Sequence, residues 1–193
     1  MFGESGKTDE VHIFDLNNEN WYNAGVPNLN RPRMLHAACA LEGIVYVAGG
    51  DRNDNTCEFI NLATPIISQK TQGFNRKWTV IHLPPFEPLI RKNPLMAPIF
   101  NGIMILGGTD KNQESISNGI YIEQSAGLEH QVIVDVPGDH IAFYCAGNQY
   151  CRGKDGSILT IAVDDDEGNL VLLEVTQDFT KRIVQDFGHH SDE

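Results

Sequence analysis

The chain has 193 residues, which is enough for one well-cored domain or for part of a repeat array. Its formal net charge of −12 disfavours a surface that neutralises phosphates, so nucleic acid is not an expected partner. No apolar run approaches the roughly 20 residues of a membrane-spanning helix, and the first residues lack the apolar core of a secretory signal. Four scattered cysteines are too few for a disulfide framework. We therefore expect a cytoplasmic protein with reduced thiols and no membrane partner.

In chain order, the first predicted element is a β-hairpin within residues 9–23. Side chains alternate through residues 11–14 as they do in a half-buried strand. The asparagine-rich segment 17–20 supplies a turn, because asparagine tolerates a left-handed backbone. Trp21 then opens the returning strand.

The strongest signal in the sequence is a repeated pattern that ends in two glycines. Residues 35–50 form an apolar strand, a Glu-Gly turn and a second apolar strand that stops at Gly49-Gly50. A thinner copy at 97–108 stops at Gly107-Gly108, 58 residues further along. A glycine pair is needed where neighbouring units crowd together and leave no room for a Cβ, or where the backbone must adopt a positive φ.

Each glycine pair is followed by a polar loop, at 51–55 and at 109–117, and then by two further strands. The last part of the chain keeps this rhythm without a glycine pair. Four short strands per unit of roughly 45–58 residues are typical of a β-propeller blade. The strands predicted after the first glycine pair are 57–62, 78–83, 95–100, 103–106, 119–123, 130–135, 141–146, 157–163, 170–175 and 182–186, with an insertion at 63–76.

These residues resemble the Kelch repeat family. Its pattern is an Arg/His-bearing first strand, a second strand that ends in Gly-Gly, an aromatic residue on the third strand and a tryptophan on the fourth. One repeat matches throughout, a half repeat precedes it, and a third repeat lacks the tryptophan, so that Val132 or Val134 must serve instead. The resemblance covers about residues 9–135 with motifs and the rest by strand rhythm. The matching residues are Phe14, Trp21, Arg33, His36, Gly49, Gly50, Phe59, Trp78, Gly107, Gly108 and Tyr121.

All of these matching residues are expected to lie in the core. Trp21 and Trp78 are predicted to fill the space between neighbouring blades, because each can bury a large apolar area. Arg33 and His36 are predicted to bond from one blade to the next.

The resemblance implies an all-β fold of Kelch-type β-propeller blades. The length allows about three and a half four-stranded blades, fewer than a closed ring of four to eight usually needs, so we expect an incomplete propeller in the form of an open arc. Its exposed end faces predict self-association through open blade edges. The expected units are a partial blade of outer strands at 1–30, a blade with an insertion at 31–90, a blade at 91–138, a degenerate blade at 139–188 and a disordered tail at 189–193.

Three local features suggest chemistry only weakly. Gly3–Thr8 is too short at its start for a phosphate-binding loop and is followed by a strand instead of a helix. Asp164–Gly168 is a contiguous acidic run, unlike the alternating ligands of a calcium loop, and favours a solvated turn. Tyr144 beside Cys145 invites comparison with galactose oxidase, a copper enzyme on a related propeller, but its copper-ligand pattern is not visible. We predict no catalytic residue, no cofactor and no metal site.

The resemblance implies a non-enzymatic scaffold that binds a protein partner through its inter-strand loops. In the family such partners include ubiquitin-ligase and cytoskeletal components. The predicted contact residues are Arg52, Asn53, Asp54, Asp110 and Lys111, for which a plain solvated loop is the alternative. Two other functional hypotheses stay open: a propeller enzyme of the sugar-modifying or galactose-oxidase-like kind, and a truncated, non-functional fragment of a larger Kelch protein.

Overall fold

The computed structural model describes residues 8–22, 26–51, 55–62, 77–83, 91–124, 130–136, 142–164 and 168–188. Within these ranges the chain forms strands and no helix, so the predicted all-β fold is confirmed. The predicted insertion at 63–76 and the predicted tail at 189–193 lie outside the described residues. The strands are β1 (Ile13–Asp15), β2 (Asn20–Tyr22), β3 (His36–Leu41), β4 (Ile44–Gly49), β5 (Thr56–Asn61), β6 (Thr79–His82), β7 (Leu95–Ile99), β8 (Gly102–Leu106), β9 (Gly119–Gln124), β10 (His130–Val136), β11 (Phe143–Arg152), β12 (Ile158–Asp164), β13 (Leu170–Val175) and β14 (Lys181–Asp186).

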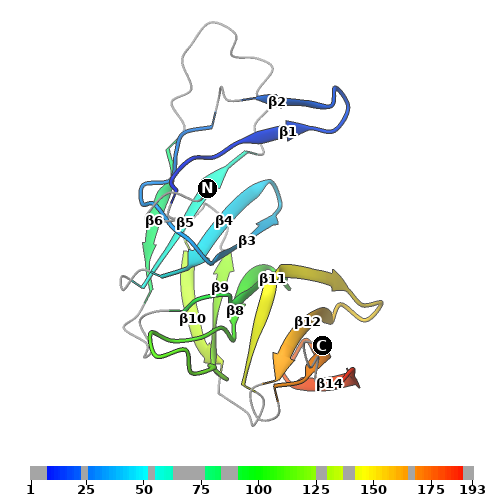
Figure 1. Ribbon diagram of the computed structural model, residues 1–193. Helices are drawn as coiled ribbons and strands as arrows, with labels where there is room; N and C mark the ends of the chain where they lie inside the picture. Colours follow the sequence, from blue (N-terminus) through cyan, green and yellow to red (C-terminus); the bar gives the residue numbers. More distant parts are fainter. Residues whose placement is uncertain are drawn as a thin grey trace, which may run out of the picture.

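The strands form one hairpin and three four-stranded antiparallel sheets (Figure 1). The hairpin is β1–β2, and the sheets are β3–β6, β7–β10 and β11–β14, each with its strands paired in chain order. Tight turns make this possible: between β3 and β4, Glu42 and Gly43 both have a positive φ, as a two-residue hairpin turn of this type requires. The hairpin and the sheets follow one another along a curved row, with the hairpin at one end and β11–β14 at the other (Figure 1).

Most strands lie where the sequence predicts them, and β13 has the predicted bounds. The first strand of the last sheet is the main difference. The sequence predicts that this strand ends at residue 146, but β11 continues to Arg152. The reason is that β11 resumes its pairing with β12 at Tyr150 after an irregularity in register that begins at Cys145.

The β7–β10 sheet packs against a neighbouring sheet on each of its two faces. We call the face that a sheet turns toward the next sheet along the chain its forward face, and the opposite one its back face. Tyr46 and Phe59 lie on the forward face of β3–β6, in one buried cluster with Met96 and Ile105 from the back face of β7–β10. The prediction that Phe59 is a core residue is therefore confirmed.

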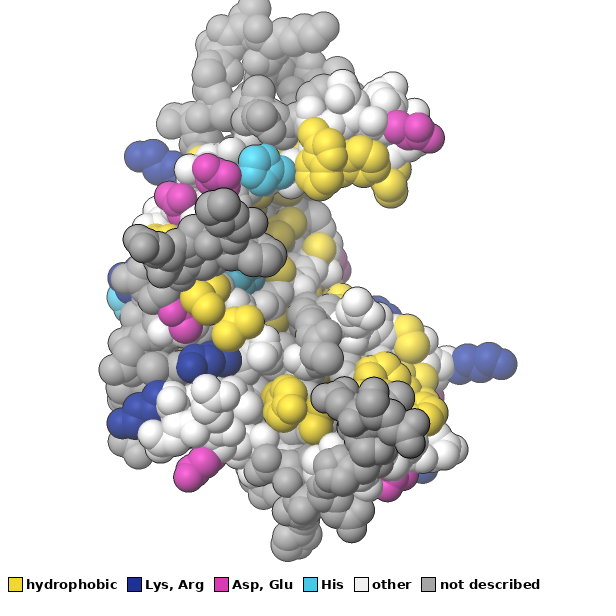
Figure 2. Space-filling view, viewed as in Figure 1, with side chains coloured by type: hydrophobic (Ala, Val, Ile, Leu, Met, Phe, Trp, Pro, Cys, Tyr) yellow, Lys and Arg dark blue, Asp and Glu magenta, His cyan; other side chains and the backbone are white. Residues whose placement is uncertain are grey.

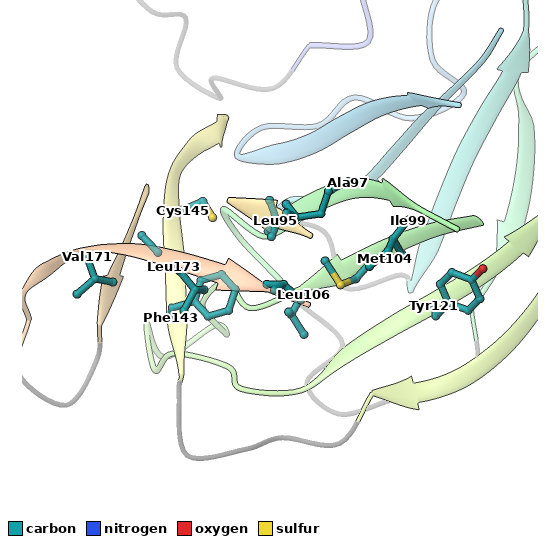
Figure 3. Close-up of a cluster of buried hydrophobic side chains, with 13 residues drawn as sticks. Leu95, Ala97, Ile99, Met104, Leu106, Tyr121, Phe143, Cys145, Val171 and Leu173 are labelled. Carbon is teal, nitrogen blue, oxygen red and sulfur yellow. The ribbon is translucent and has the colours of Figure 1, made fainter. Parts of the chain in front are cut away.

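The contact between β7–β10 and β11–β14 repeats this arrangement (Figure 3). Leu95, Met104 and Tyr121 from the forward face of β7–β10 share a cluster with Phe143 and Leu173 from the back face of β11–β14. Adjacent residues of a strand point to opposite faces, so β7 and β8 contribute to both contacts and are buried along their whole length. Tyr121 is a core residue, as predicted. The side chains of β10, including Val132 and Val134, lie outside the described residues.

The back face of β3–β6 is covered by the chain that leads into it. Trp78 shares a buried cluster there with Ile60 and Leu29. Its indole Nε1–H donates to the Pro27 carbonyl at 2.8 Å. The predicted burial of Trp78 is confirmed, and its cover includes the connecting segment before β3.

The aromatic residues of the hairpin contradict the prediction that they belong to the core. Trp21 is 64% exposed and Phe14 is 41% exposed. The two residues are cross-strand partners in β1 and β2, and their ring centroids lie 5.0 Å apart. They stay exposed because none of the described sheets packs against this face of the hairpin.

The glycine pairs lie where successive sheets meet. The Gly50 N–H donates to the Arg91 carbonyl at 2.8 Å, and the Gly108 N–H donates to the Phe143 carbonyl at 2.8 Å. All four glycines have a positive φ. A Cβ on Gly107 would lie 2.7 Å from the Phe143 carbonyl oxygen, and one on Gly49 would lie 2.7 Å from the Arg91 oxygen. Both physical reasons for a glycine pair therefore apply.

We expect Gly107→Ala to lower the free energy of unfolding by more than Gly188→Ala. Both substitutions place a Cβ in a left-handed backbone, which costs about 1–2 kcal/mol. Only Gly107 also faces a neighbouring backbone, because a Cβ on Gly188 (φ +77°) meets nothing within 4 Å. Urea denaturation of the two variants measures the difference, which we expect to reach about 2 kcal/mol. Equal losses would show that the contact between the sheets does not require glycine.

Candidate functional site at the glycine-pair end

The two strands that precede the predicted contact loops, β4 and β8, stop at a common end of the row of sheets. Gly50, which follows β4, lies beside Arg91, which precedes β7, and Gly108, which follows β8, lies beside Phe143, which begins β11. Since β7 and β8 are antiparallel, β7 begins at the end of its sheet where β8 stops. Asp164 at the end of β12 pairs with Phe143. The ends of β4, β8 and β12 therefore lie at one end of the row, which we call the glycine-pair end.

Arg33 organises the β3–β6 sheet at this end through a buried ion pair. Its side chain is 1% exposed, and its Nε–H and Nη2–H donate to Glu58 Oε1 at 3.1 and 3.0 Å. Nη2–H also donates to Thr56 Oγ1 at 2.7 Å, and Nη1–H to the Gly49 carbonyl at 2.9 Å. Glu58 accepts a further bond from the Asn30 N–H at 2.7 Å. The cost of burying two charges is thus offset by a nearly complete set of hydrogen bonds.

The prediction that Arg33 and His36 bond between units is wrong for the side chain of Arg33. Its guanidinium bonds inside its own sheet, and only its backbone reaches another unit, through paired bonds with Thr8 at 2.9 and 3.2 Å. His36 is exposed and is not a core residue. Its pKa lies below the ordinary value of a histidine because partial desolvation, and secondarily the Arg33 cation, disfavour the imidazolium.

Arg91 donates to the first glycine of the pair in its own sheet, as Arg33 does, and it was not among the predicted site residues. Its Nη1–H donates to the Gly107 carbonyl at 2.6 Å and to the Asn118 carbonyl at 2.9 Å, and its Nη2–H donates to Asn118 Oδ1 at 2.8 Å. The signal was present, because Arg91 follows Arg33 by 58 residues, the spacing that also separates Gly49 from Gly107.

These bonds form a continuous line through three sheets. Arg33 donates to the carbonyl of Gly49, and the next residue, Gly50, donates its N–H to Arg91. Arg91 donates in turn to the carbonyl of Gly107, and the next residue, Gly108, donates to Phe143. Side-chain bonds within a sheet thus alternate with backbone bonds between sheets. We call this line the arginine–glycine relay.

The loop after the second glycine pair is closed by its own hydrogen bonds. Asp110 Oδ1 accepts from the Asn112 N–H at 2.7 Å and from the Glu114 N–H at 2.9 Å. Thr109 and Ser115 form an isolated bridge at the base of the loop, and Ile116 is buried beneath it. The carboxylate of Asp110, predicted to contact a partner, is therefore engaged within the loop.

The last sheet supports this loop from the side. Lys181 is 4% exposed, and its Nζ donates to the Ser117 carbonyl at 2.6 Å. The same ammonium lies 5.9 Å from the centroid of the Phe143 ring, within the range of a cation–π contact. The loop is thus fixed at both of its ends.

The side chains between these fixed points face solvent. Lys111, Asn112, Gln113 and Glu114 are all exposed, which agrees with the prediction that Lys111 is an exposed charge. The other predicted contact residues, Arg52, Asn53 and Asp54, lie outside the described residues. So do Gly3–Lys7 of the weak phosphate-loop motif and residues 165–167 of the acidic run.

The buried thiols are not suited to nucleophilic chemistry. All four cysteines are free, and Cys39, Cys57 and Cys145 are buried. Burial raises the pKa of Cys57 to about 12 and that of Cys145 to about 11, and it raises the pKa of Cys39 as well, so all three remain thiols at neutral pH. The part of the chain that the structure describes contains no group of three His, Cys, Asp or Glu residues placed to hold a metal ion. Nor do these ranges contain a helix that is long and apolar enough to cross a membrane.

No protein-family model matches this chain, and no curated protein matches it significantly.

We expect Arg33→Met to lower the free energy of unfolding by about 3–5 kcal/mol, because it leaves the Glu58 carboxylate buried without its cation. The double variant Arg33→Met/Glu58→Met should recover part of this loss, since it removes both charges. Arg182→Met is the comparison variant: it removes an arginine that is 68% exposed from Glu174, whose side chain is 10% exposed and also accepts from the Ser157 hydroxyl, so it should cost less than Arg33→Met. Chemical denaturation of the four proteins measures these terms. Similar losses for Arg33→Met and Arg182→Met would contradict the organising role of Arg33.

Proposed function

We propose that this chain is an arc of Kelch-type propeller blades that acts as a non-enzymatic scaffold and binds a protein partner at its glycine-pair end. The Kelch resemblance suggests the architecture, and the three four-stranded sheets, joined at glycine pairs, are consistent with it. The basic and acidic groups described in the interior of this end, Arg33, Glu58 and Arg91, are engaged in holding the sheets. Recognition is therefore assigned to the loops.

The observation that carries this proposal is the fixed loop at 109–117. It exposes four polar side chains in a row, while its backbone is held by Asp110 and by Lys181. Gln113 has a φ of +73°, an unusual conformation for a residue other than glycine that the surrounding bonds maintain. A loop that is ordered before binding loses less conformational entropy when a partner docks. This arrangement favours a specific contact surface.

The composition of the segments that follow β4, β8 and β12 suggests the kind of partner. The segments 51–55, 110–117 and 164–169 contain eight carboxylates and only two cations, Arg52 and Lys111. Such an excess of negative charge attracts a basic partner and favours fast, salt-dependent association. The proposed partner is therefore a protein with a basic contact surface.

Isosteric removal of negative charge from the loop tests this function. In affinity purification from the source cells with quantitative mass spectrometry, Glu114→Gln should weaken the capture of a specific set of proteins. The matched control, Glu42→Gln, makes the same change at an exposed turn at the opposite end of the sheets and should leave that set intact. Proteins lost with the first variant should be enriched in basic surfaces and should elute at raised salt. A set of captured proteins that responds equally to both variants would contradict binding through this loop.

A further inference from the structure

The two contacts between successive four-stranded sheets are of one kind. In each of them, the forward face of one sheet meets the back face of the next. The two faces are different surfaces, so the row of sheets has a direction. One end of the row therefore presents a forward face, on β11–β14, and the other presents a back face, on the β1–β2 hairpin.

The forward face of β11–β14 is apolar although no described sheet covers it. Ile158, Ala162 and Leu173 point to the buried back face, so their neighbours in the strands point to the forward face. Ile161 lies on that face opposite Leu172 and is 41% exposed. We call this surface the forward end face; its apolar residues are Tyr144, Leu159, Ile161, Val163, Leu170 and Leu172, related by cross-strand pairing.

The hairpin presents the complementary kind of surface. Thr8 bridges to Arg33 as Gly50 bridges to Arg91, so β1 and β2 take the positions of a third and a fourth strand relative to the following sheet. In β3–β6 the third and fourth strands carry Ile60 and Trp78 on the back face, where both are buried. In the hairpin, Phe14 and Trp21 lie on the exposed face, and the His12 ring lies 6.4 Å from that of Trp21. We call His12, Phe14 and Trp21 the hairpin end face.

We propose that the occupant of the forward end face is the hairpin end face of a second copy of this chain. Such a contact continues the forward-to-back packing that already joins the sheets within the molecule, and it covers apolar surface on both partners. Figure 2 shows apolar side chains over the hairpin and over the last sheet on either side of an open hollow. The contact is heterologous, so the copies form a closed ring if the rotation between them closes, or a longer chain of copies if it does not.

Sedimentation velocity over a range of protein concentrations tests this contact. The unmodified chain should self-associate, and Trp21→Lys and Ile161→Lys should each weaken the association at least about tenfold, because each places a charge in an apolar contact. Leu172→Lys serves as a second variant of the forward end face, and circular dichroism checks that each variant is folded. Phe100→Lys is the matched control: Phe100 is 55% exposed in a turn outside both end faces, and its substitution should leave the association unchanged.

A mixing experiment distinguishes this contact from a symmetric one. The Trp21→Lys chain keeps its forward end face and the Ile161→Lys chain keeps its hairpin end face, so an equimolar mixture should form a heterodimer although neither variant associates alone. An unmodified chain that stays monomeric at about 100 µM would overturn the proposal. It would also be overturned if the two end faces were covered only when a different protein is added. Association that is lost with Ile161→Lys but kept with Trp21→Lys would show a symmetric sheet-to-sheet dimer and would overturn it too.

Discussion

The rest of the structure depends on the arginine–glycine relay. Arg33 and Arg91 each donate to the carbonyl of the first glycine of a pair, and the second glycine donates its N–H to the next sheet. Burial of apolar side chains drives the sheets together, but it does not fix their relative position, because hydrophobic burial is not directional. The relay fixes that position, since each hydrogen bond holds one backbone position of a sheet against one position of its neighbour.

The relay also limits where function can reside. The guanidinium of Arg33 and the carboxylate of Glu58 are buried and bonded to each other, so they are not available to a substrate. Burial keeps the thiols of Cys57 and Cys145 protonated, which removes two further reactive groups. Among the described residues, a fixed polar loop faces solvent at the glycine-pair end, and apolar side chains face solvent at the two ends of the row. We propose the first surface for recognition of another protein and the second for contact with a copy of the same chain.

The sequence allows much of the fold to be predicted, because it repeats. The strand order, the glycine pairs and the buried positions of Phe59, Trp78 and Tyr121 follow from spacing and from the alternation of side chains. The exposure of Trp21 does not follow, because a local pattern records which face of a strand is apolar and not whether another sheet covers it. The ion pair of Arg33 within its own sheet could not be predicted from the sequence either. Its partner Glu58 is 25 residues away, between the apolar residues Cys57 and Phe59, and nothing in the local pattern links the two charges. The role of Arg91 could have been predicted from the sequence, because Arg91 follows Arg33 at the same 58-residue spacing that separates the glycine pairs.

Hydrogen exchange of two backbone amides tests the relay most directly. If the Gly50 and Gly108 N–H groups join the sheets, they should exchange only when the whole row unfolds, with the same protection as the amide of Leu106 in the core of β7–β10. The amide of Lys111 in the exposed part of the loop provides the unprotected reference. Exchange of Gly50 and Gly108 at a rate near that of Lys111 would show that the sheets separate without global unfolding, and would contradict this account of what holds them together.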